Sequence, residues 1–194
     1  MGSPLIIRLS CALILSFLFT GCGGLQEVWE GPGAKAFRPQ AIAVLPPMAS
    51  QYDIAREEVQ EVVAEVLHKS TQIERVVSPE SVTDIFQSSK VAFDALVVYV
   101  SRLEMTGHSD KDSAVQLGKA LNVDSFLVVR VNSWEYDRGV GLSLRLIDAT
   151  TGTTIWKARH ERSASYIFFK PTLKDVAKKL AEEMIKSMPP YQRR

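Results

Sequence analysis

The chain has 194 residues, enough for one domain with a sizeable core and short for two. Its 23 Lys and Arg residues nearly balance its 22 Asp and Glu residues, so the formal charge is +1 at pH 7. This balance lacks the concentrated positive charge of nucleic-acid-binding proteins, so we expect no nucleic acid partner. The 46% of hydrophobic residues argues against disorder, and 2 Cys exclude a disulfide-rich scaffold.

The N-terminus has the pattern of a secretory signal peptide. Arg8 is the only charged residue before Glu27, and it precedes a mainly apolar run over 9–19 that is followed by small residues. A transmembrane helix needs about 20 apolar residues, which is more than this run offers. We therefore predict that residues 1–21 are a signal peptide. A membrane-spanning anchor is the alternative, because the uncharged stretch continues to residue 26.

The end of this signal resembles a bacterial lipobox, with the sequence Leu18-Phe19-Thr20-Gly21-Cys22. In that signal the Cys thiol receives a diacylglyceryl group and becomes the acylated first residue. Phe19 departs from the usual Leu at its position, whereas the small residues beside the cleavage point are kept. Two or three acyl chains, such as palmitate, anchor a protein stably, because each buried methylene contributes about 0.8 kcal/mol. The resemblance implies lipidation of Cys22; the alternative is an unmodified Cys after an ordinary secretory signal.

Lipidation of Cys22 has consequences for thiol chemistry and location. Cys11 falls inside the signal, so no thiol remains for a disulfide or a Cys-based metal site. In lipoproteins of Gram-negative bacteria, an Asp after the lipidated Cys retains the protein in the inner membrane. Gly23 stands there instead. The resemblance therefore implies a lipoprotein of the outer membrane that faces the periplasm and contacts the bilayer through acylated Cys22.

We expect residues 22–39 to be the lipid anchor and a flexible tether, because this segment is rich in Gly and Pro and has few apolar positions. Trp29 lies in the segment, and it either rests at the lipid interface or packs on the domain. Residues 40–190 form a single periplasmic α/β domain in this interpretation, and residues 191–194 are a tail.

The first half of the domain predicts alternating strands and helices. An apolar run over 40–45 that ends at two prolines indicates a buried strand. Helical spacing of apolar residues follows Asp53, and 72–77 is a candidate strand before a short helix that opens at Pro79. The stretch 92–105 contains residues of strand propensity. Its apolar positions recur every three or four residues, which favours a helix.

The second half changes to the period of strands. In chain order, we expect a helix capped by Ser109 or Asp110, strands over 125–133 and 140–147, a turn at 148–152, a strand over 153–162 and a helix opened by a capping box at 172–175. The predicted fold class is α/β (α+β). A mixed central sheet is flanked by helices, with an antiparallel C-terminal meander and a closing helix.

Three segments, 41–47, 117–127 and 146–156, resemble in this order motifs of a group of bacterial envelope lipoproteins. The motifs are an opening strand, a helix followed by an Asp and the central strand, and a hairpin signature. The group includes the curli-secretion lipoprotein CsgG, the penicillin-binding-protein activator LpoB, the GNA-type lipoproteins of Neisseria and the amino-terminal domain of TolB. The resemblance implies an α/β sandwich used for assembly and partner binding, although a shared fold does not fix function.

No arrangement of residues in the sequence predicts catalysis. We interpret His68 as solvated at a helix end, His108 as part of a capping turn, and His160 as solvated on a strand. The acids Glu58, Glu61 and Glu65 follow a helical stripe that indicates a solvated face. The small basic clusters at 159–162 and 193–194 are interpreted as solubilising. Because a Gly-rich phosphate loop and an HExxH motif are missing, we predict no catalytic residue, no cofactor and no metal site.

These observations predict a noncatalytic lipoprotein that serves the cell envelope as an assembly, scaffolding or partner-binding module. Its protein partner is unidentified, and self-association into a homo-oligomer stays open. One alternative is a subunit of a CsgG-like oligomeric secretion complex, but only 140–148 alternates cleanly enough for a barrel strand. The other is an activator of a peptidoglycan synthase, for which 22–39 is a short arm. An enzyme is a third alternative.

Overall fold

The computed structural model describes residues 27–46, 52–69, 73–163 and 171–189. The predicted signal peptide and Cys22 lie outside the described residues, so their assignment stays a prediction. In the described part of the chain, none of the helices combines the length and the apolar character needed to span a membrane.

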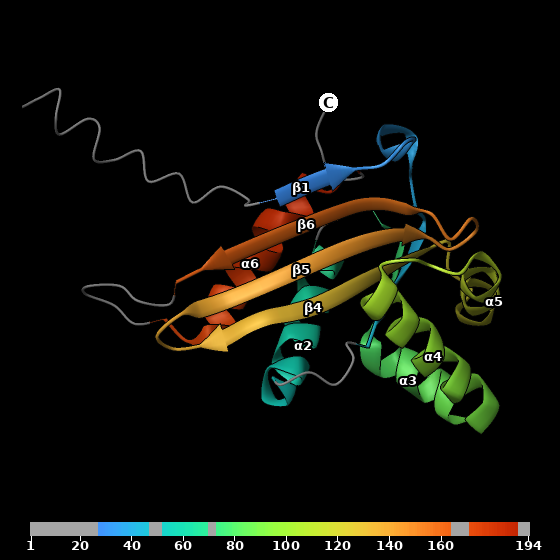
Figure 1. Ribbon diagram of the computed structural model, residues 1–194, viewed down its shortest axis with the longest axis horizontal. Coiled ribbons are helices and arrows are strands. Elements are labelled where there is room, and N and C mark those ends of the chain that lie inside the picture. The colour runs from blue at the N-terminus through green and yellow to red at the C-terminus, as the bar shows by residue number, and fades with distance from the viewer. Residues whose placement is uncertain (1–26, 47–51, 70–72, 164–170, 190–194) are drawn as a thin grey trace, which may run out of the picture.

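The centre of the molecule is a six-stranded mixed sheet (Figure 1). Its strands, in spatial order, are β1 (Glu27–Glu30), β6 (Thr154–Arg162), β5 (Gly139–Asp148), β4 (Ser125–Glu135), β2 (Ala41–Leu45) and β3 (Arg75–Val77). β2 runs parallel to both β3 and β4, whereas β4, β5, β6 and β1 pair antiparallel in succession. This arrangement confirms the predicted mixed sheet with its C-terminal antiparallel meander.

The helices begin and end where the sequence offers caps. They are α2 (Asp53–Lys69), α3 (Pro79–Gln87), α4 (Lys90–Thr106), α5 (Lys111–Leu121) and α6 (Leu173–Ser187), and a short 3-10 turn spans Ala34–Ala36. The Asp110 carboxylate accepts the Ser113 N–H at the start of α5, and Thr172 forms the predicted capping box with Asp175. Gly107 ends α4 with a φ of 72°, a left-handed conformation that suits glycine. The helical interpretation of 92–105 is therefore confirmed.

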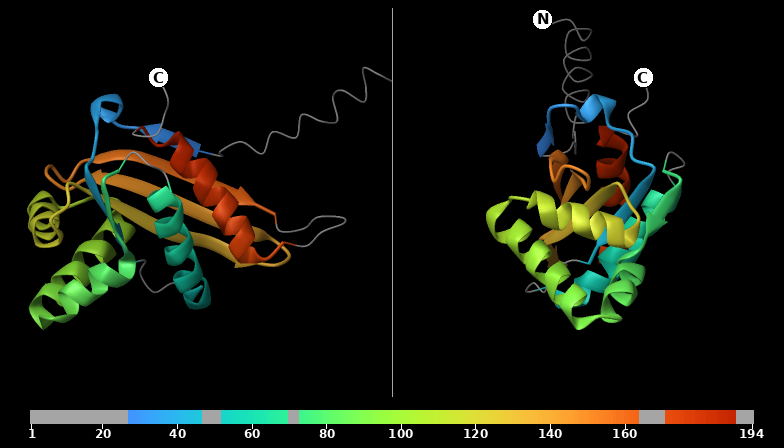
Figure 2. Two further views of the ribbon diagram at one scale, coloured as in Figure 1. Left: turned by 180° about the vertical axis from the view of Figure 1, so that it is seen from behind. Right: turned by 90° about the vertical axis from the view of Figure 1, so that its right-hand side faces the viewer.

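The connections place the helices on opposite faces of the sheet. The chain passes from β2 through α2 to the neighbouring β3, and then returns through α3, α4 and α5 past β2 to β4. Crossovers between parallel strands are right-handed as a rule, and these two run in opposite directions, so their helices are expected on opposite faces. Figure 2 shows α2 and α6 side by side on one face and α3, α4 and α5 on the other.

Each face has its own apolar core. The core under α2 and α6 includes Val63, Leu144, Trp156 and Leu180, and the core under α3, α4 and α5 includes Phe86, Leu103, Leu117 and Phe126. Leu144, Trp156 and Ala158 point to the first core, as the alternation in the sequence predicts. The intervening residues point to the other face, and there α3–α5 cover only the end of the sheet around β2 and β4 (Figure 1).

The three segments that resemble the envelope lipoproteins meet at one end of the sheet. The Asp124 carboxylate accepts the N–H groups of Gln40 (2.8 Å) and Ala41 (3.2 Å), which joins the start of β4 to the start of β2. A side-chain Cβ at Gly118 of α5 would lie 2.9 Å from Cβ of Ala149, so the helix touches the hairpin closely. These signature residues are thus explained by chain packing.

The structure corrects two expectations. Glu27–Glu30 is an edge strand paired with β6, whereas we expected all of 22–39 to be a tether. Trp29 therefore packs on the domain, with Lys157 over its ring, although 43% of its surface is exposed. His160 was expected on a solvated face but is only 2% exposed, because its position in β6 points it toward α6. Simple alternation from Trp156 and Ala158, which lie four and two residues earlier, already places His160 on this buried face.

Candidate functional site

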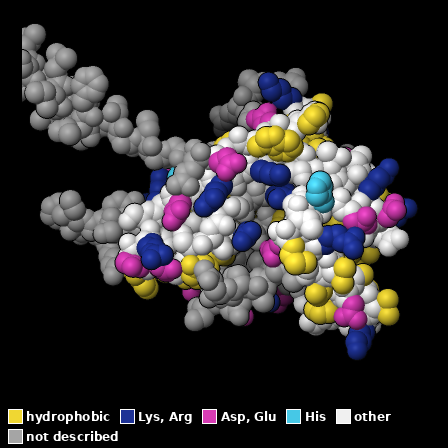
Figure 3. All heavy atoms as spheres, in the orientation of Figure 1, with side chains coloured by type: hydrophobic (Ala, Val, Ile, Leu, Met, Phe, Trp, Pro, Cys, Tyr) yellow, Lys and Arg dark blue, Asp and Glu magenta, His cyan; other side chains and the backbone are white. Residues whose placement is uncertain are grey.

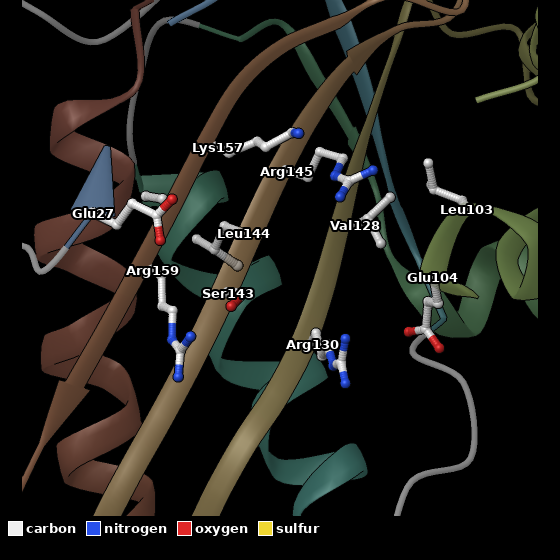
Figure 4. A pocket seen from close by; sticks show the side chains of 11 residues that line it. Glu27, Leu103, Glu104, Val128, Arg130, Ser143, Leu144, Arg145, Lys157 and Arg159 are labelled. Carbon is white, nitrogen blue, oxygen red and sulfur yellow. The ribbon is translucent and has the colours of Figure 1, made fainter. Parts of the chain in front are cut away.

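A hollow lies on the sheet face that α3–α5 leave open, between the end of α4 and strands β4, β5 and β6 (Figure 4). It encloses about 190 Å³ and is lined by Glu27, Leu103, Glu104, Val128, Arg130, Ser143, Leu144, Arg145, Lys157, Ala158 and Arg159. Four of these residues are cations. We call them, Arg130, Arg145, Lys157 and Arg159, the basic cluster.

Strand register brings the basic cluster together from three strands. Arg145 of β5 pairs with Lys157 of β6, and the neighbouring pair on the same face is Ser143 with Arg159. On the other side of β5, Arg130 of β4 pairs with Ser143. Because directly paired residues have Cβ atoms about 5 Å apart, Arg145 and Lys157 adjoin each other, whereas Ser143 lies between Arg130 and Arg159. Figure 4 shows Lys157 extending toward Arg145, whose guanidinium extends in turn toward the side of β4 and α4.

Arg145 is held at the back of the hollow by the end of α4. Its Nη1 donates a hydrogen bond of 2.8 Å to the carbonyl oxygen of Gly107, the residue that ends that helix. A cation is favourable beside the carbonyl groups at a helix C-terminus. Burial lowers the pKa of Arg145 from its ordinary value. The guanidinium nevertheless stays protonated at neutral pH, because the ordinary pKa of an Arg is above about 12.

Lys157 lies beside Arg145 and against the edge strand. Its Nζ is 5.2 Å from the centroid of the Trp29 ring, a cation–π arrangement across the β1–β6 pair. Burial lowers the pKa of Lys157, the neighbouring charge of Arg145 lowers it further, and Glu27 acts in the opposite direction. The two cations therefore repel each other at a partly buried position.

The hollow carries an excess of positive charge. Within the described part of the chain, none of the four cations has a carboxylate oxygen within 4.0 Å. Glu27 and Glu104 flank the hollow at its two sides, so its four cations outnumber its carboxylates by two. Figure 3 shows Lys and Arg side chains gathered over the middle of this face. The arrangement is suited to hold an anionic group by charge and hydrogen bonds.

The three histidines lie on separate parts of the fold. His68 is exposed at the end of α2, and His108 is exposed in the turn between α4 and α5, where its N–H donates to Thr106. Both agree with the sequence interpretation. His160 is buried with Glu183 on the face opposite the hollow. Among the residues that the structure describes, no three His, Cys, Asp or Glu side chains group as a metal site would require.

The sequence analysis missed the basic cluster. It interpreted the cations at 159–162 as a solubilising group, whereas Arg159 and Arg162 point to opposite faces of the sheet. Arg162 binds Glu183 of α6, and Arg159 joins the hollow. The alternation along the strands could have revealed the cluster. Arg145 on one predicted strand, and Lys157 and Arg159 on the strand predicted to pair with it, all alternate with the buried apolar residues and so lie on the same face of the sheet.

Comparison with known proteins identifies the fold. No protein-family model matches the sequence, and no curated protein sequence matches it. PelC from Paraburkholderia phytofirmans, solved as a dodecamer, superimposes with a TM-score of 0.56 at 18% identity, over 87% of this chain and 97% of that chain. A Leu-to-Met variant of that dodecamer gives a TM-score of 0.55 at 18% identity, over 86% and 99% of the two chains.

Lipoprotein GNA1162 from Neisseria meningitidis is also similar, with a TM-score of 0.49 at 18% identity, over 77% of this chain and 99% of that chain. The chain has a structure similar to that of PelC, which confirms the expected resemblance to the CsgG- and LpoB-type lipoprotein fold.

Proposed function

We propose that this protein is a noncatalytic lipoprotein of the bacterial envelope, anchored by acylated Cys22, whose α/β domain binds protein partners and copies of itself. The anchor places it at the outer membrane, facing the periplasm. The observation that carries the proposal is the lipobox-like segment that ends at Cys22, directly before a domain with the fold of PelC.

The position of β1 supports a role close to the membrane. β1 begins at Glu27, five residues after Cys22. Even fully extended, such a segment spans only about 18 Å, because each residue contributes at most about 3.6 Å. The edge strand, and the domain with it, would therefore stay near the bilayer surface.

The use of the signature residues supports a binding role over catalysis. The Asp124 carboxylate accepts backbone N–H groups of the neighbouring strand, and the Asp148 carboxylate accepts the N–H and hydroxyl of Thr150 in the hairpin turn. Both carboxylates are thus engaged in holding the backbone. Among the residues that the structure describes, the helices leave uncovered the part of the sheet face that carries the basic cluster.

Self-association is supported by PelC, which was solved as a dodecamer. For the same reason, a subunit of an oligomeric secretion complex is the second candidate function. Crosslinking and native mass spectrometry of the full chain in detergent test this part. We expect a closed oligomer larger than a dimer; a monomer at all protein concentrations would overturn the self-association.

The anchor is tested by Cys22→Ala, with Cys11→Ala as the matched control inside the predicted signal. We expect the unaltered chain and the Cys11→Ala variant to take up labelled acyl chains and to fractionate with the outer membrane. The Cys22→Ala variant should remain unlabelled and leave the membrane fraction. Unchanged membrane retention of an unlabelled Cys22→Ala variant would contradict the lipid anchor.

A further inference from the structure

We infer that the hollow on the open sheet face is a binding site for a phosphate group, held by the basic cluster. This inference goes beyond the proposed function, because it rests on the folded domain and not on the lipid anchor. The phosphate can be that of a free anion or that of a lipid headgroup, and the experiment below distinguishes these two sources.

The charges of the hollow match a phosphate monoester. The four cations of the basic cluster exceed the two flanking carboxylates by two positive charges. A phosphate monoester carries a charge of about −1.5 to −2 near neutral pH. Guanidinium groups bind phosphate oxygens through paired N–H donors, and a Lys ammonium adds a compact charge. Three Arg and one Lys supply both kinds of donor.

The geometry also favours a small anion. Arg145 donates one N–H to the carbonyl oxygen of Gly107, and this hydrogen bond fixes the position of the guanidinium. The other N–H donors of the guanidinium remain available. Lys157 is held over the Trp29 ring, at 5.2 Å from the ring centroid. The hollow between them encloses about 190 Å³, room for a phosphate group with its ester substituent pointing outward.

Burial strengthens the case for a counter-ion. Arg145 and Lys157 are only partly exposed, and within the described part of the chain neither forms an ion pair. Their mutual repulsion is unfavourable, and a bound anion would add an attraction to both cations. By contrast, in an ion pair elsewhere in the molecule, such as Arg162 with Glu183, a carboxylate balances the charge of the cation.

The test uses the full chain inserted in lipid nanodiscs and phosphorus NMR, which observes either source of phosphate. In the first arm, inorganic phosphate is titrated onto protein in neutral phosphatidylcholine discs. In the second, the discs contain phosphatidic acid and the headgroup resonance is followed. A saturable response in the first arm assigns a free phosphate anion, and a response in the second arm alone assigns a lipid headgroup.

The variant pair Lys157→Gln with Arg159→Gln removes two cations of the cluster. The matched control, Lys179→Gln with Lys186→Gln, removes two exposed cations of α6 on the opposite face. We expect the cluster variant to weaken binding roughly tenfold for each lost cation, because each change removes a charged hydrogen-bond donor to the phosphate. The control should bind like the unaltered chain. If the cluster variant fails to fold, the exposed Arg130→Gln replaces it.

Three outcomes would overturn the inference. The first is the lack of a saturable response in both arms. The second is an equal loss of binding in the cluster variant and in the control, which would indicate general attraction to a positive surface. The third is saturable binding of polyglutamate without any response to phosphate, which would assign the hollow to an acidic protein partner.

Discussion

Nε2 of His160 lies 3.2 Å from Oε2 of Glu183, which joins the last strand of the sheet to the closing helix. The backbone N–H of Glu161 donates to Nδ1 of the same ring at 3.0 Å. In the neutral ring, Nε2 therefore carries the hydrogen that Glu183 accepts. The other carboxylate oxygen binds Arg162 at 2.9 Å, so one half-buried carboxylate serves two side chains of β6.

Replacing this carboxylate should destabilise the protein. In Glu183→Ala, the buried ring of His160 loses the acceptor of its N–H, and we expect the free energy of unfolding to fall by about 1–3 kcal/mol. Urea unfolding of the full chain in detergent measures this change. Glu182→Ala, at the adjacent position of α6, is the matched control and should lose much less. An equal loss in both variants would contradict the role of Glu183.

Glu65 should make stability depend on acid pH. Its carboxylate accepts hydrogen bonds from Lys69 and Lys178, and these two cations lower the pKa of Glu65 from 4.5 to about 2. The unfolded chain therefore takes up this proton at a higher pH than the folded chain. The stabilisation is fully present above pH 4.5 and is lost as the pH falls toward about 2.

Unfolding midpoints of Glu65→Gln between neutral pH and pH 2 test this dependence. We expect the variant to lose stability at neutral pH and to approach the unaltered chain as the acid is protonated. Glu57→Gln, an exposed position of the same helix, should keep the acid dependence of the unaltered chain. Parallel pH profiles of the Glu65→Gln variant and the unaltered chain would exclude this carboxylate as the source.

Asp124 should be required for stability and not for any reaction. In Asp124→Ala, the N–H groups of Gln40 and Ala41 lose their carboxylate acceptor at the start of β2. We expect a loss of about 1–3 kcal/mol in the free energy of unfolding. Asp137→Ala, in the exposed turn between β4 and β5, should cost little. A fully stable Asp124→Ala variant would mean that solvent replaces this acceptor.

Gly118 should be intolerant of a side chain. A Cβ there would lie 2.9 Å from Cβ of Ala149 and 3.1 Å from the carbonyl oxygen of Val123. We expect Gly118→Ala to cost about 1–3 kcal/mol through this crowding, although alanine favours a helix. Adding Ala149→Gly relieves one of the two contacts, so the double variant should be more stable than the sum of the single changes predicts. Strict additivity would show that α5 shifts away from the hairpin instead.

The sequence by itself determined the elements of this fold. Helical and strand periods, the caps at Asp110 and Thr172, and the glycine that ends α4 act over a few residues, so they can be recognised without knowing what packs against them. The order of the elements then favoured the mixed sheet with an antiparallel meander. The resemblance carried by three short segments was confirmed by the likeness to PelC.

Only the tertiary structure decided how polar residues are used. The alternation in the sequence predicts that Arg145 and Lys157 lie on the same face of the sheet. It is the register of β4, β5 and β6, however, that brings the cations of three strands into one hollow. The same holds for His160, whose burial depends on α6 covering one face. The edge strand Glu27–Glu30 is too short for its periodicity to be recognised, and it forms because β6 offers it unpaired backbone groups. Such outcomes depend on contacts between distant segments, which local sequence patterns do not encode.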